Sequence, residues 1–241
     1  ILPTTTPIIQ KGEVLPWLYE YNGIVPPLTQ LTVGAKGLGV NVTSPEPDAV
    51  VRKMPVLIRV GEKIYPSMLL ENIRLVNRSK RIKVIAKQHG IDEILVSKKA
   101  GIPVNHNAEM YINYADPEKY TQLSVEQVFS TEHADKIKGR IVILGMDAAG
   151  LSVLKYTPHG LTTDQMITAQ ALDTTMTGDY LYRIPKADTY EIVFMGLLGL
   201  LLIILIPRLS VLFSVPLLLF VLGGISYASF LVYANKGFLV D

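Results

Sequence analysis

The two longest apolar stretches of the chain lie close together near its C-terminal end. Residues 192–206 carry no charged side chain, and a second uncharged stretch covers residues 209–234 after Pro207 and Arg208. Because a helix rises about 1.5 Å per residue, about 20 apolar residues span the hydrocarbon core of a membrane. The second stretch is long enough alone, and the first becomes so when it is extended back to residue 188. The pattern predicts a transmembrane helical hairpin over residues 188–206 and 209–234.

The part of the chain before these stretches, residues 1–187, shows the shorter, mixed patterns of a folded domain. A β-rich run over residues 50–60 and a glycine turn predict a hairpin that returns through residues 63–65. Pro66 suits the first position of a helix, and apolar residues at helical spacing continue this helix to Asn77. Further short elements are expected as strands at 7–9, 83–86, 93–97 and 110–114, and as a helix from Ser124, with a capping box at Gln127, to Phe129.

The clearest folding unit of this domain lies between residues 140 and 178. Residues 140–144 contain a short continuous apolar run, which is typical of a strand buried on both faces of a sheet. A loop follows to Gly160, and the pattern then predicts a helix over residues 162–176 that ends at Gly178. A buried strand, a loop and a helix predict a βα unit. We therefore expect an α/β domain with a mixed sheet, in which the strand at 140–144 is central.

Composition and charge narrow the functions that are open to this chain. The net charge of +2 is too small to indicate a nucleic-acid partner, and the mean hydropathy of +0.32 follows from the two apolar stretches. The chain has no cysteine, which excludes disulfides and thiolate chemistry. Its four histidines, His89, His106, His133 and His159, show no metal-ligand spacing. We therefore expect no metal, no cofactor and no nucleic acid, and a lipid bilayer as one partner.

Several short motifs follow one another along the chain. They are Gly37–Val42, Asp48–Arg52, Tyr65–Ser67, Ile112–Tyr114, Gly139–Gly145, Thr157–Pro158 and Thr177–Tyr180, and closely spaced membrane helices follow them. Over roughly residues 30–235 the chain resembles the CHASE domain of type two, a cyclase/histidine-kinase-associated sensory extracellular domain. It departs from that pattern at Ala49, where a glycine is usual, and at Asp164 and Thr168, where Gly and His often stand.

The resemblance implies a membrane-anchored sensory module of a bacterial receptor. In such a protein the α/β head, here residues 1–187, lies outside the cytoplasmic membrane, and membrane helices pass its signal to a cytoplasmic output domain. That output, a nucleotide cyclase, a kinase or a cyclic-dinucleotide enzyme, would lie downstream of residues 235–241, which begin a further segment, and more family sequence would lie upstream. We also expect an unknown small-molecule ligand and a homodimer through the membrane helices, with no catalysis in this part of the protein.

The basic residues beside the two spans favour the opposite orientation of the head. Arg183 and Lys186 precede the first span and Lys236 follows the second, whereas the loop between the spans contains only Arg208. Because cytoplasmic flanks are enriched in Lys and Arg, this bias alone predicts a cytoplasmic head. Large domains are translocated largely regardless of charge. We therefore follow the resemblance and expect an extracytoplasmic head on a multi-pass protein of the cell membrane.

Six residues are candidates for ligand binding: Asp48, Arg52, Asn113, Tyr114, Asp147 and Asp164. Asp48 and Arg52 suit a polar ligand, because the guanidinium group of arginine can bind a carboxylate through two hydrogen bonds. The alternative is that Asp48 only forms hydrogen bonds to the backbone of its own turn. Asp147 follows the predicted strand at 140–144, and ligands of open α/β sheets bind beyond the carboxyl ends of strands. Asn113 and Tyr114 end another predicted strand and Asp164 begins the next helix, so these residues could face one crevice that suits a small polar or cationic ligand. The alternative for each is ordinary turn and cap chemistry.

Two functions of other classes compete with the sensory one. Gly150 and Ser152 form a partial nucleophile elbow, with Asp147 and His159 nearby in the sequence, which would suit a membrane-anchored hydrolase. The second glycine of the elbow is missing and the order of the triad is not met. The third class is a non-catalytic scaffold that only holds partners at the membrane.

Overall fold

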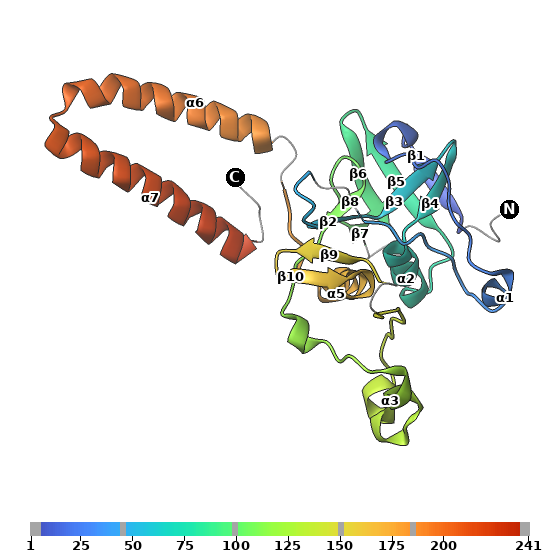
Figure 1. Cartoon of the computed structure of the whole chain (residues 1–241). Helices are drawn as coiled ribbons and strands as arrows, with labels where there is room; N and C mark the ends of the chain where they lie inside the picture. Colours follow the sequence, from blue (N-terminus) through green and yellow to red (C-terminus); the bar gives the residue numbers. More distant parts are fainter. Residues whose placement is uncertain (1–5, 44–46, 98–100, 149–151, 184–186, 237–241) are drawn as a thin grey trace. The chain divides into compact units, whose positions relative to one another are not determined.

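The computed structural model describes residues 6–43, 47–97, 101–148, 152–183 and 187–236 (Figure 1). The chain divides into two compact units, which are residues 1–179 and residues 180–241. The first unit contains the strands and all six candidate ligand-binding residues, and the second unit contains two long helices.

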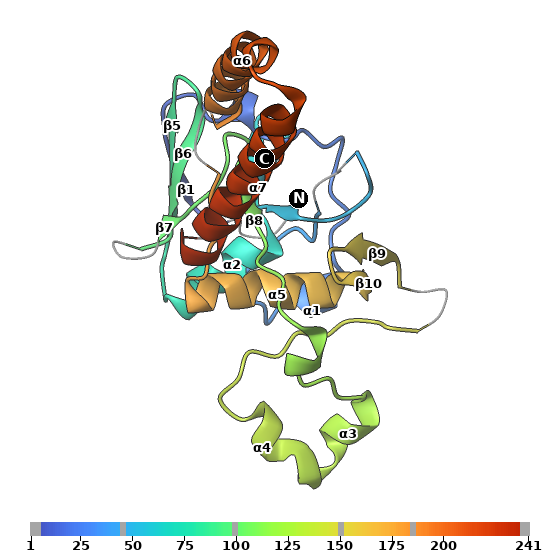
Figure 2. The same ribbon diagram turned by 90° about the vertical axis from the view of Figure 1, so that its left-hand side faces the viewer.

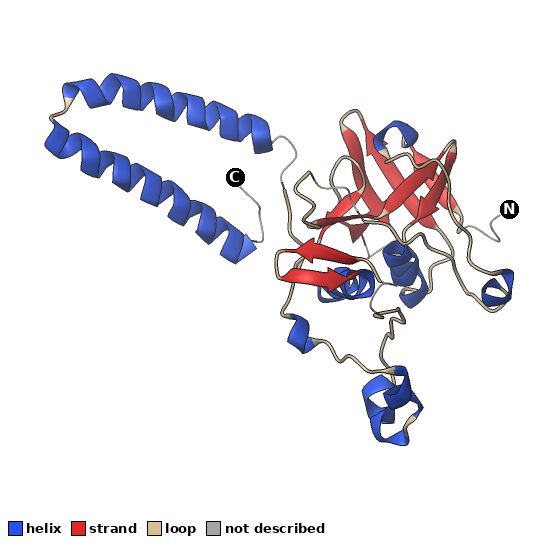
Figure 3. Ribbon diagram, viewed as in Figure 1, coloured by secondary structure: helices blue, strands red, loops and turns tan. Residues whose placement is uncertain are grey.

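The largest sheet of the first unit has four strands in the order β1-β5-β6-β7. Figure 3 draws the strands in red. These strands are β1 (Ile8–Lys11), β5 (Ile82–Lys87), β6 (Gly90–Leu95) and β7 (Gly101–Ile102). β1 runs parallel to β5, and the other neighbouring strands are antiparallel. Buried and exposed side chains alternate along β5, which is the pattern of a strand with one face toward a core and the other toward solvent.

Three two-stranded sheets accompany this sheet among the described residues. β2 (Lys53–Pro55) pairs with β8 (Glu109–Tyr111), β3 (Leu57–Val60) with β4 (Lys63–Pro66), and β9 (Leu154–Thr157) with β10 (Gly160–Thr163), each in antiparallel orientation. Gly61, at φ +57°, closes the β3–β4 hairpin, because glycine adopts positive φ without strain.

Two helices pack against each other beneath the strands in the view of Figure 1: α2 (Met68–Val76) and α5 (Asp164–Thr177). The Ser67 hydroxyl accepts a hydrogen bond from the N–H of Leu70 and caps α2, and Gly178, at φ +80°, ends α5. The fully buried apolar side chains come from these helices and from the strands: Met54, Leu57, Ile58, Leu69, Leu70, Ile82, Ile94, Ile102, Met110 and Ile167. Helices and strands therefore share one core.

Shorter helices lie in the connections of the first unit. They are η1 (Leu15–Trp17), α1 (Thr29–Thr32), η2 (Pro117–Lys119), α3 (Val125–Phe129), η3 (Thr131–His133) and α4 (Ala134–Ile137). α3 and α4 form an excursion away from the strands in both views (Figures 1 and 2). The predicted capping box of α3 is confirmed, since Ser124 and Gln127 each accept the backbone N–H of the other.

The second unit consists mainly of α6 (Ala187–Leu205), η4 (Ile206–Arg208) and α7 (Val211–Lys236). Thr189–Arg208 and Leu212–Leu231 are each long and apolar enough to cross a membrane. The two apolar helices predicted from the sequence are therefore present. Pro216 lies inside α7, as membrane helices tolerate.

Most short elements of the first unit are confirmed with small shifts of their bounds. The hairpin at 50–65 forms as β3 and β4, and the strands expected near 7–9, 83–86 and 93–97 correspond to β1, β5 and β6. Pro66 is the last residue of β4 rather than the first of a helix, because the Ser67 cap starts α2 at Met68. The helix expected from residue 162 begins at Asp164, since residues 162 and 163 belong to β10.

The prediction of a central strand at residues 140–144 is wrong. Residues 141–148 contain no helix or strand, and no described strand pairs with them. Val142 is 60% exposed and Leu144 is 88% exposed, so the apolar run lies at the surface. The run has the composition of a buried strand, but a strand forms only where a neighbouring strand pairs with its N–H and C=O groups. The segment is instead held by α5, where the Gln165 side chain donates to the Met146 carbonyl.

Candidate functional site

A cavity of about 290 Å³ lies beside α5 in the first unit. α5 contributes Met166 and Gln170. One segment, which begins at η2, contributes Pro117 and Gln122, and a second segment contributes Asp147. The β9–β10 hairpin provides the rest of the lining, namely Leu154, Thr157, His159, Leu161, Thr162 and Thr163. A water molecule occupies about 30 Å³ and pockets for drug-sized ligands begin near 300 Å³, so the cavity suits a small molecule.

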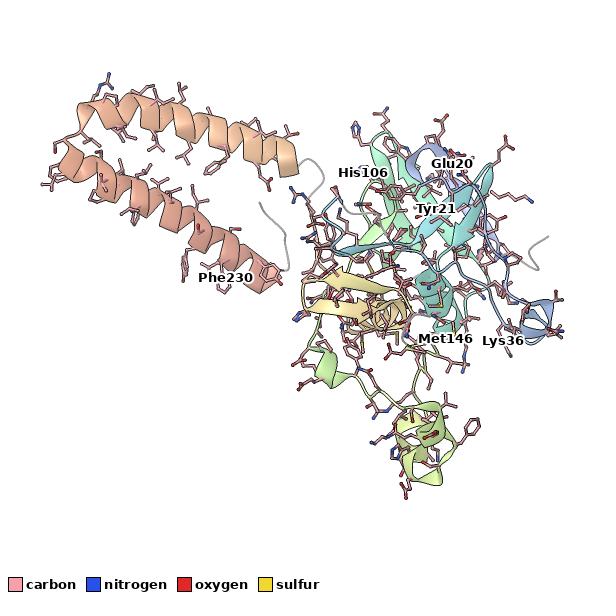
Figure 4. The ribbon with its side chains drawn as sticks, viewed as in Figure 1. Glu20, Tyr21, Lys36, His106, Met146 and Phe230 are labelled. Atoms are coloured by element: carbon pink, nitrogen blue, oxygen red, sulfur yellow. The ribbon has the colours of Figure 1, made fainter. Side chains whose placement is uncertain are left out.

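Helix α5 holds both loop segments that line this cavity. The Tyr120 hydroxyl donates to the Asp173 carboxylate at 2.9 Å, which ties the segment containing Pro117 and Gln122 to the helix. Burial, together with this carboxylate, raises the pKa of Tyr120, so the phenol remains a hydrogen-bond donor over the physiological range. The Gln165 amide donates to the Met146 carbonyl at 2.8 Å. Met146, which is labelled in Figure 4, lies one residue before Asp147.

Gly145 allows the second loop segment to approach α5 closely. A Cβ atom at this position would lie 2.6 Å from Cδ of Gln165, which is closer than non-bonded carbon atoms come. The approach leaves Asp147 exposed at the cavity. Asp147 makes no hydrogen bond or ion pair to another described residue, so its carboxylate is available to a ligand.

Gln170 forms the buried side of the cavity. Its side chain is 1% exposed, and its Oε1 has no hydrogen-bond partner among the described residues. A buried polar atom without a partner costs about 1–3 kcal/mol, so native structures pair nearly all such atoms with protein, water or ligand. The oxygen itself is buried, so a molecule in the cavity does not reach it in this structure.

Asn113 and Tyr114 do not line the cavity, although they lie near it. The Asn113 amide donates to the Asp179 carbonyl at 3.2 Å, and its backbone N–H donates to the Thr174 hydroxyl at 3.1 Å. The Tyr114 hydroxyl donates to the Val51 carbonyl at 2.8 Å, and burial raises its pKa. Its ring lies 6.5 Å from the ring of His159, which is a lining residue. The Asn113 side chain therefore fastens its segment to the chain just after α5, and the Tyr114 side chain fastens it to Val51.

Asp164 also lies outside the cavity lining. Its carboxylate pairs with the Lys155 ammonium at 2.6 Å, and the same ammonium donates to the Thr43 hydroxyl at 2.7 Å. The pair joins the first residue of α5 to β9, and an acidic side chain in the first turn is favourable to the helix dipole.

Asp48 and Arg52 bind each other at a separate place. Their closest atoms are 2.7 Å apart, and both side chains are about half exposed. The Val50 N–H also donates to Asp48 at 3.0 Å, so the carboxylate ties its own turn as well. Hydrogen bonds from Arg52 and from this N–H lower the pKa of Asp48 to about 2. Neither residue lines the cavity.

Asp147 was expected at a ligand site from the sequence, and His159 only in the hydrolase alternative. Gln122 and Gln170 were not expected, and Thr157 was noted only as part of a family motif. Gln170 carries the only local signal, because it is a polar residue in the middle of a helix whose neighbours Ile167 and Ala171 are buried. Ser152, the proposed nucleophile of the hydrolase alternative, is not a lining residue, so the cavity lends that alternative no support.

Comparison with protein families matches residues 6–205 to the CHASE2 domain. The chain belongs to the CHASE2 domain family. CHASE2 domains are sensory, non-catalytic domains of signalling receptors, so the resemblance drawn from the short motifs is confirmed. The match continues from the first unit through α6. No curated protein and no solved structure matches the chain.

Gly37 and Gly39 of this CHASE2 domain stand where α2 leaves no room for a side chain. A Cβ atom on Gly37 would overlap the Glu71 carboxylate, and one on Gly39 would lie 2.5 Å from Cα of Met68. The backbone of Val40 exchanges hydrogen bonds with Pro66 and Met68 at 2.9 and 2.8 Å. The segment around Gly37 and Gly39 therefore lies directly against α2, which explains why glycine stands at these two positions.

Proposed function

We propose that the chain is the extracytoplasmic sensory part of a bacterial membrane receptor, which binds a small molecule in the cavity beside α5. The observation that carries the proposal is the CHASE2 match, which runs from residue 6 to residue 205 and so includes most of the first candidate span. A sensory head and a membrane helix thus belong to one family unit. The output domain that the proposal requires, a nucleotide cyclase, kinase or cyclic-dinucleotide enzyme, would lie beyond residue 241.

The connection between α5 and α6 supports a direct route for the signal. α5 contributes Gln170 to the cavity and binds both loop segments that line it. It ends at Gly178, and only residues 178–186 separate it from α6. A ligand that favours one of two arrangements of α5 would shift their populations, and the chain continues from that helix into the membrane.

The glycines of the membrane helices support a homodimer through these helices. A Cβ atom on Gly196, Gly199 or Gly224 would meet no other atom within 4 Å. These small residues are therefore not required for packing within one hairpin. In membranes small residues let helices of different chains approach closely, so a second copy would use them.

Limited proteolysis of spheroplasts tests this proposal through the sidedness of the head. Protease added to intact spheroplasts is expected to digest the first unit and to leave a protected fragment that contains α6 and α7. A cytoplasmic marker protein that stays intact controls for lysis. Full protection of the first unit, followed by its digestion after permeabilisation, would contradict the extracytoplasmic location.

A further inference from the structure

The stretch that joins α2 to β5 and β6 concentrates positive charge. Between Glu71 and Asp92 the chain carries six basic residues and no acidic one. Two of the six are paired with these flanking carboxylates, Arg74 with Glu71 at 2.6 Å and Lys87 with Asp92 at 2.8 Å. The other four form what we call the basic patch: Arg78, Lys80, Arg81 and Lys83.

All four side chains of the basic patch are exposed, and none of them forms an ion pair with another described residue. They lie within residues 78–83, so no two of their Cα atoms are more than about 18 Å apart. Like charges at such short distances repel one another. A partner that presents several negative charges to the patch would remove this repulsion.

Strand β5 places part of the basic patch on the outer face of the four-stranded sheet. Ile82 and Val84 are 0% exposed and face the core, so Lys83 between them points to the outer face. Arg81 lies two residues before Lys83, about 7 Å along an extended chain, and is exposed as well. These two cations therefore stand side by side on one surface.

Apolar side chains lie among the cations on this outer face. Lys83 is opposite Ile9 of β1 on one side and Leu95 of β6 on the other, in strands that lie side by side (Figure 2). Neighbouring strands are about 4.8 Å apart, so these side chains are in reach of one another. Ile9 is 42% exposed, and the next position along the face pairs Ile85 with the exposed Lys11. Cations interleaved with apolar side chains suit an anionic membrane interface.

The chain itself brings such an interface within reach of the first unit. Only residues 178–186 separate α5 from α6, and these nine residues span at most about 30 Å when fully extended. The first candidate span begins at Thr189. The first unit is therefore held close to any membrane that α6 crosses, whereas a soluble anionic partner has to be recruited from solution.

We infer that the basic patch docks the first unit on the anionic headgroups of the bilayer that holds α6 and α7. The four cations bind lipid phosphates, and Ile9 and Leu95 contact the headgroup region. Each lysine or arginine near an anionic membrane surface raises the affinity about fivefold. The docked fraction therefore depends on lipid charge and on ionic strength. The inference goes beyond the proposed function, because it concerns neither the ligand nor the side of the membrane on which the first unit lies.

Fluorescence quenching of the full chain in nanodiscs tests this docking. The discs contain phosphatidylcholine alone or phosphatidylcholine mixed with phosphatidylglycerol, and both carry a quencher on a fraction of the headgroups. Because the chain has no cysteine, Val76→Cys places one fluorophore two residues before Arg78, and Glu126→Cys places one on α3 as a control. Quenching at each label reports its distance from the lipid headgroups.

Two variants with the same change in net charge separate the basic patch from charge in general. The patch variant replaces its four basic residues: Arg78→Gln, Lys80→Gln, Arg81→Gln and Lys83→Gln. The control variant replaces four exposed basic residues from η2 to the end of the α3–α4 excursion: Lys119→Gln, Lys136→Gln, Lys138→Gln and Arg140→Gln. Thermal unfolding verifies that both variants fold.

Phosphatidylglycerol is expected to increase quenching of the label at residue 76 in the unmodified chain and in the control variant, but not in the patch variant. Removal of four cations should lower the ratio of docked to undocked heads about a hundredfold or more. The increase should also vanish in 1 M salt, where the screening length falls to about 3 Å from about 10 Å at 0.1 M. The label at residue 126 should not respond to phosphatidylglycerol.

Equal quenching at residue 76 with and without phosphatidylglycerol would overturn the inference, as would equal responses of the patch and control variants. A patch variant that changes the cross-linked oligomeric state in discs of phosphatidylcholine alone, without any effect of phosphatidylglycerol, would also overturn it and make the patch an interface between copies. The lipid and salt comparisons use the unmodified chain, so they decide the question even if the patch variant does not fold. None of these results affects the protease test of the proposed function.

Discussion

At the scale of single residues, one buried ion pair connects four segments of the first unit. Both nitrogens Nε and Nη2 of Arg74 donate to the Glu71 carboxylate, at 2.9 and 2.6 Å, and the two side chains are 11% and 4% exposed. The Thr6 hydroxyl donates to the same carboxylate at 2.9 Å, and Arg74 also donates to the Lys36 and Ser79 carbonyls. The pair therefore holds the start of the chain and two loops against α2.

Removal of Arg74 is expected to destabilise the first unit strongly. Arg74→Met leaves the buried Glu71 carboxylate without its cation, which should cost about 3–5 kcal/mol of the free energy of unfolding. Urea unfolding of the full chain in detergent, followed by the fluorescence of Trp17, the chain's single tryptophan, measures this loss. Lys87→Met removes the cation of an exposed pair and should cost less than about 1 kcal/mol. Equal losses for the two variants would contradict the prediction.

The exposed pair of Asp48 and Arg52 predicts a pH dependence instead of a large stability change. The pKa of Asp48 falls from its ordinary value of 3.8 to about 2 in the folded chain. A lowered folded-state pKa stabilises the fold above the ordinary value, and the contribution is lost as pH falls from about 4 to about 2. As the pH falls through this window, the unfolding temperature of Asp48→Asn should therefore decrease less than that of the unmodified chain. Identical profiles for variant and unmodified chain would exclude the effect.

At the scale of elements, two glycines let their segments lie directly against the helices α2 and α5. Gly39 brings its segment against the first turn of α2, and Gly145 brings its segment against α5. In both cases the neighbouring atoms leave no space for a Cβ atom. Because glycine has no Cβ atom, each of the two residues lets a loop pack closely against a helix.

Gly39→Ala is expected to destabilise the first unit by about 1–3 kcal/mol, the usual cost of overpacking. The added Cβ would lie 2.6 Å from the Ser67 carbonyl oxygen and 2.7 Å from the Met68 nitrogen, so the backbone hydrogen bonds of Val40 must lengthen. Gly23→Ala is the matched control, because no atom lies within 4 Å of the Cβ position there. Thermal unfolding of both variants measures the difference, and similar melting temperatures would show that the segment can move without cost.

At the scale of the whole molecule, the loop between the two apolar helices can report how the chain crosses the membrane. If both Thr189–Arg208 and Leu212–Leu231 cross the membrane, that loop and the first unit lie on opposite sides. The absence of native cysteine makes a single introduced cysteine the only thiol in the chain. Ser210 lies exposed in the loop, and Glu62 lies exposed in the β3–β4 turn.

In intact spheroplasts a membrane-impermeant maleimide should label only one of the variants Glu62→Cys and Ser210→Cys. An extracytoplasmic head predicts that Glu62→Cys is labelled and that Ser210→Cys is labelled only after permeabilisation. The reverse pattern would keep two crossings but place the head in the cytoplasm, as the basic flanks favour. Labelling of both positions before permeabilisation would exclude the paired crossings.

Local pattern by itself determined the elements that depend on neighbours in the chain. The two apolar helices, the β3–β4 hairpin, α2 and the capping box of Ser124 and Gln127 all follow from composition and spacing within a few residues. The order of short motifs also determined the family, which the CHASE2 match confirms. These features need no knowledge of distant contacts, because helical periodicity, turn glycines and caps act over a single element.

Only the tertiary structure decided what becomes of residues 140–144 and which residues meet at the cavity. The run has a strand's composition, yet pairing with another strand depends on segments far away in the chain, and here none of the described strands is beside it. For the same reason Asp147 was expected at the end of a strand but lines a cavity to which Gln170 also contributes, a residue that is distant in sequence and has no motif. Local sequence specifies an element's tendency, whereas burial and partners are properties of the complete fold.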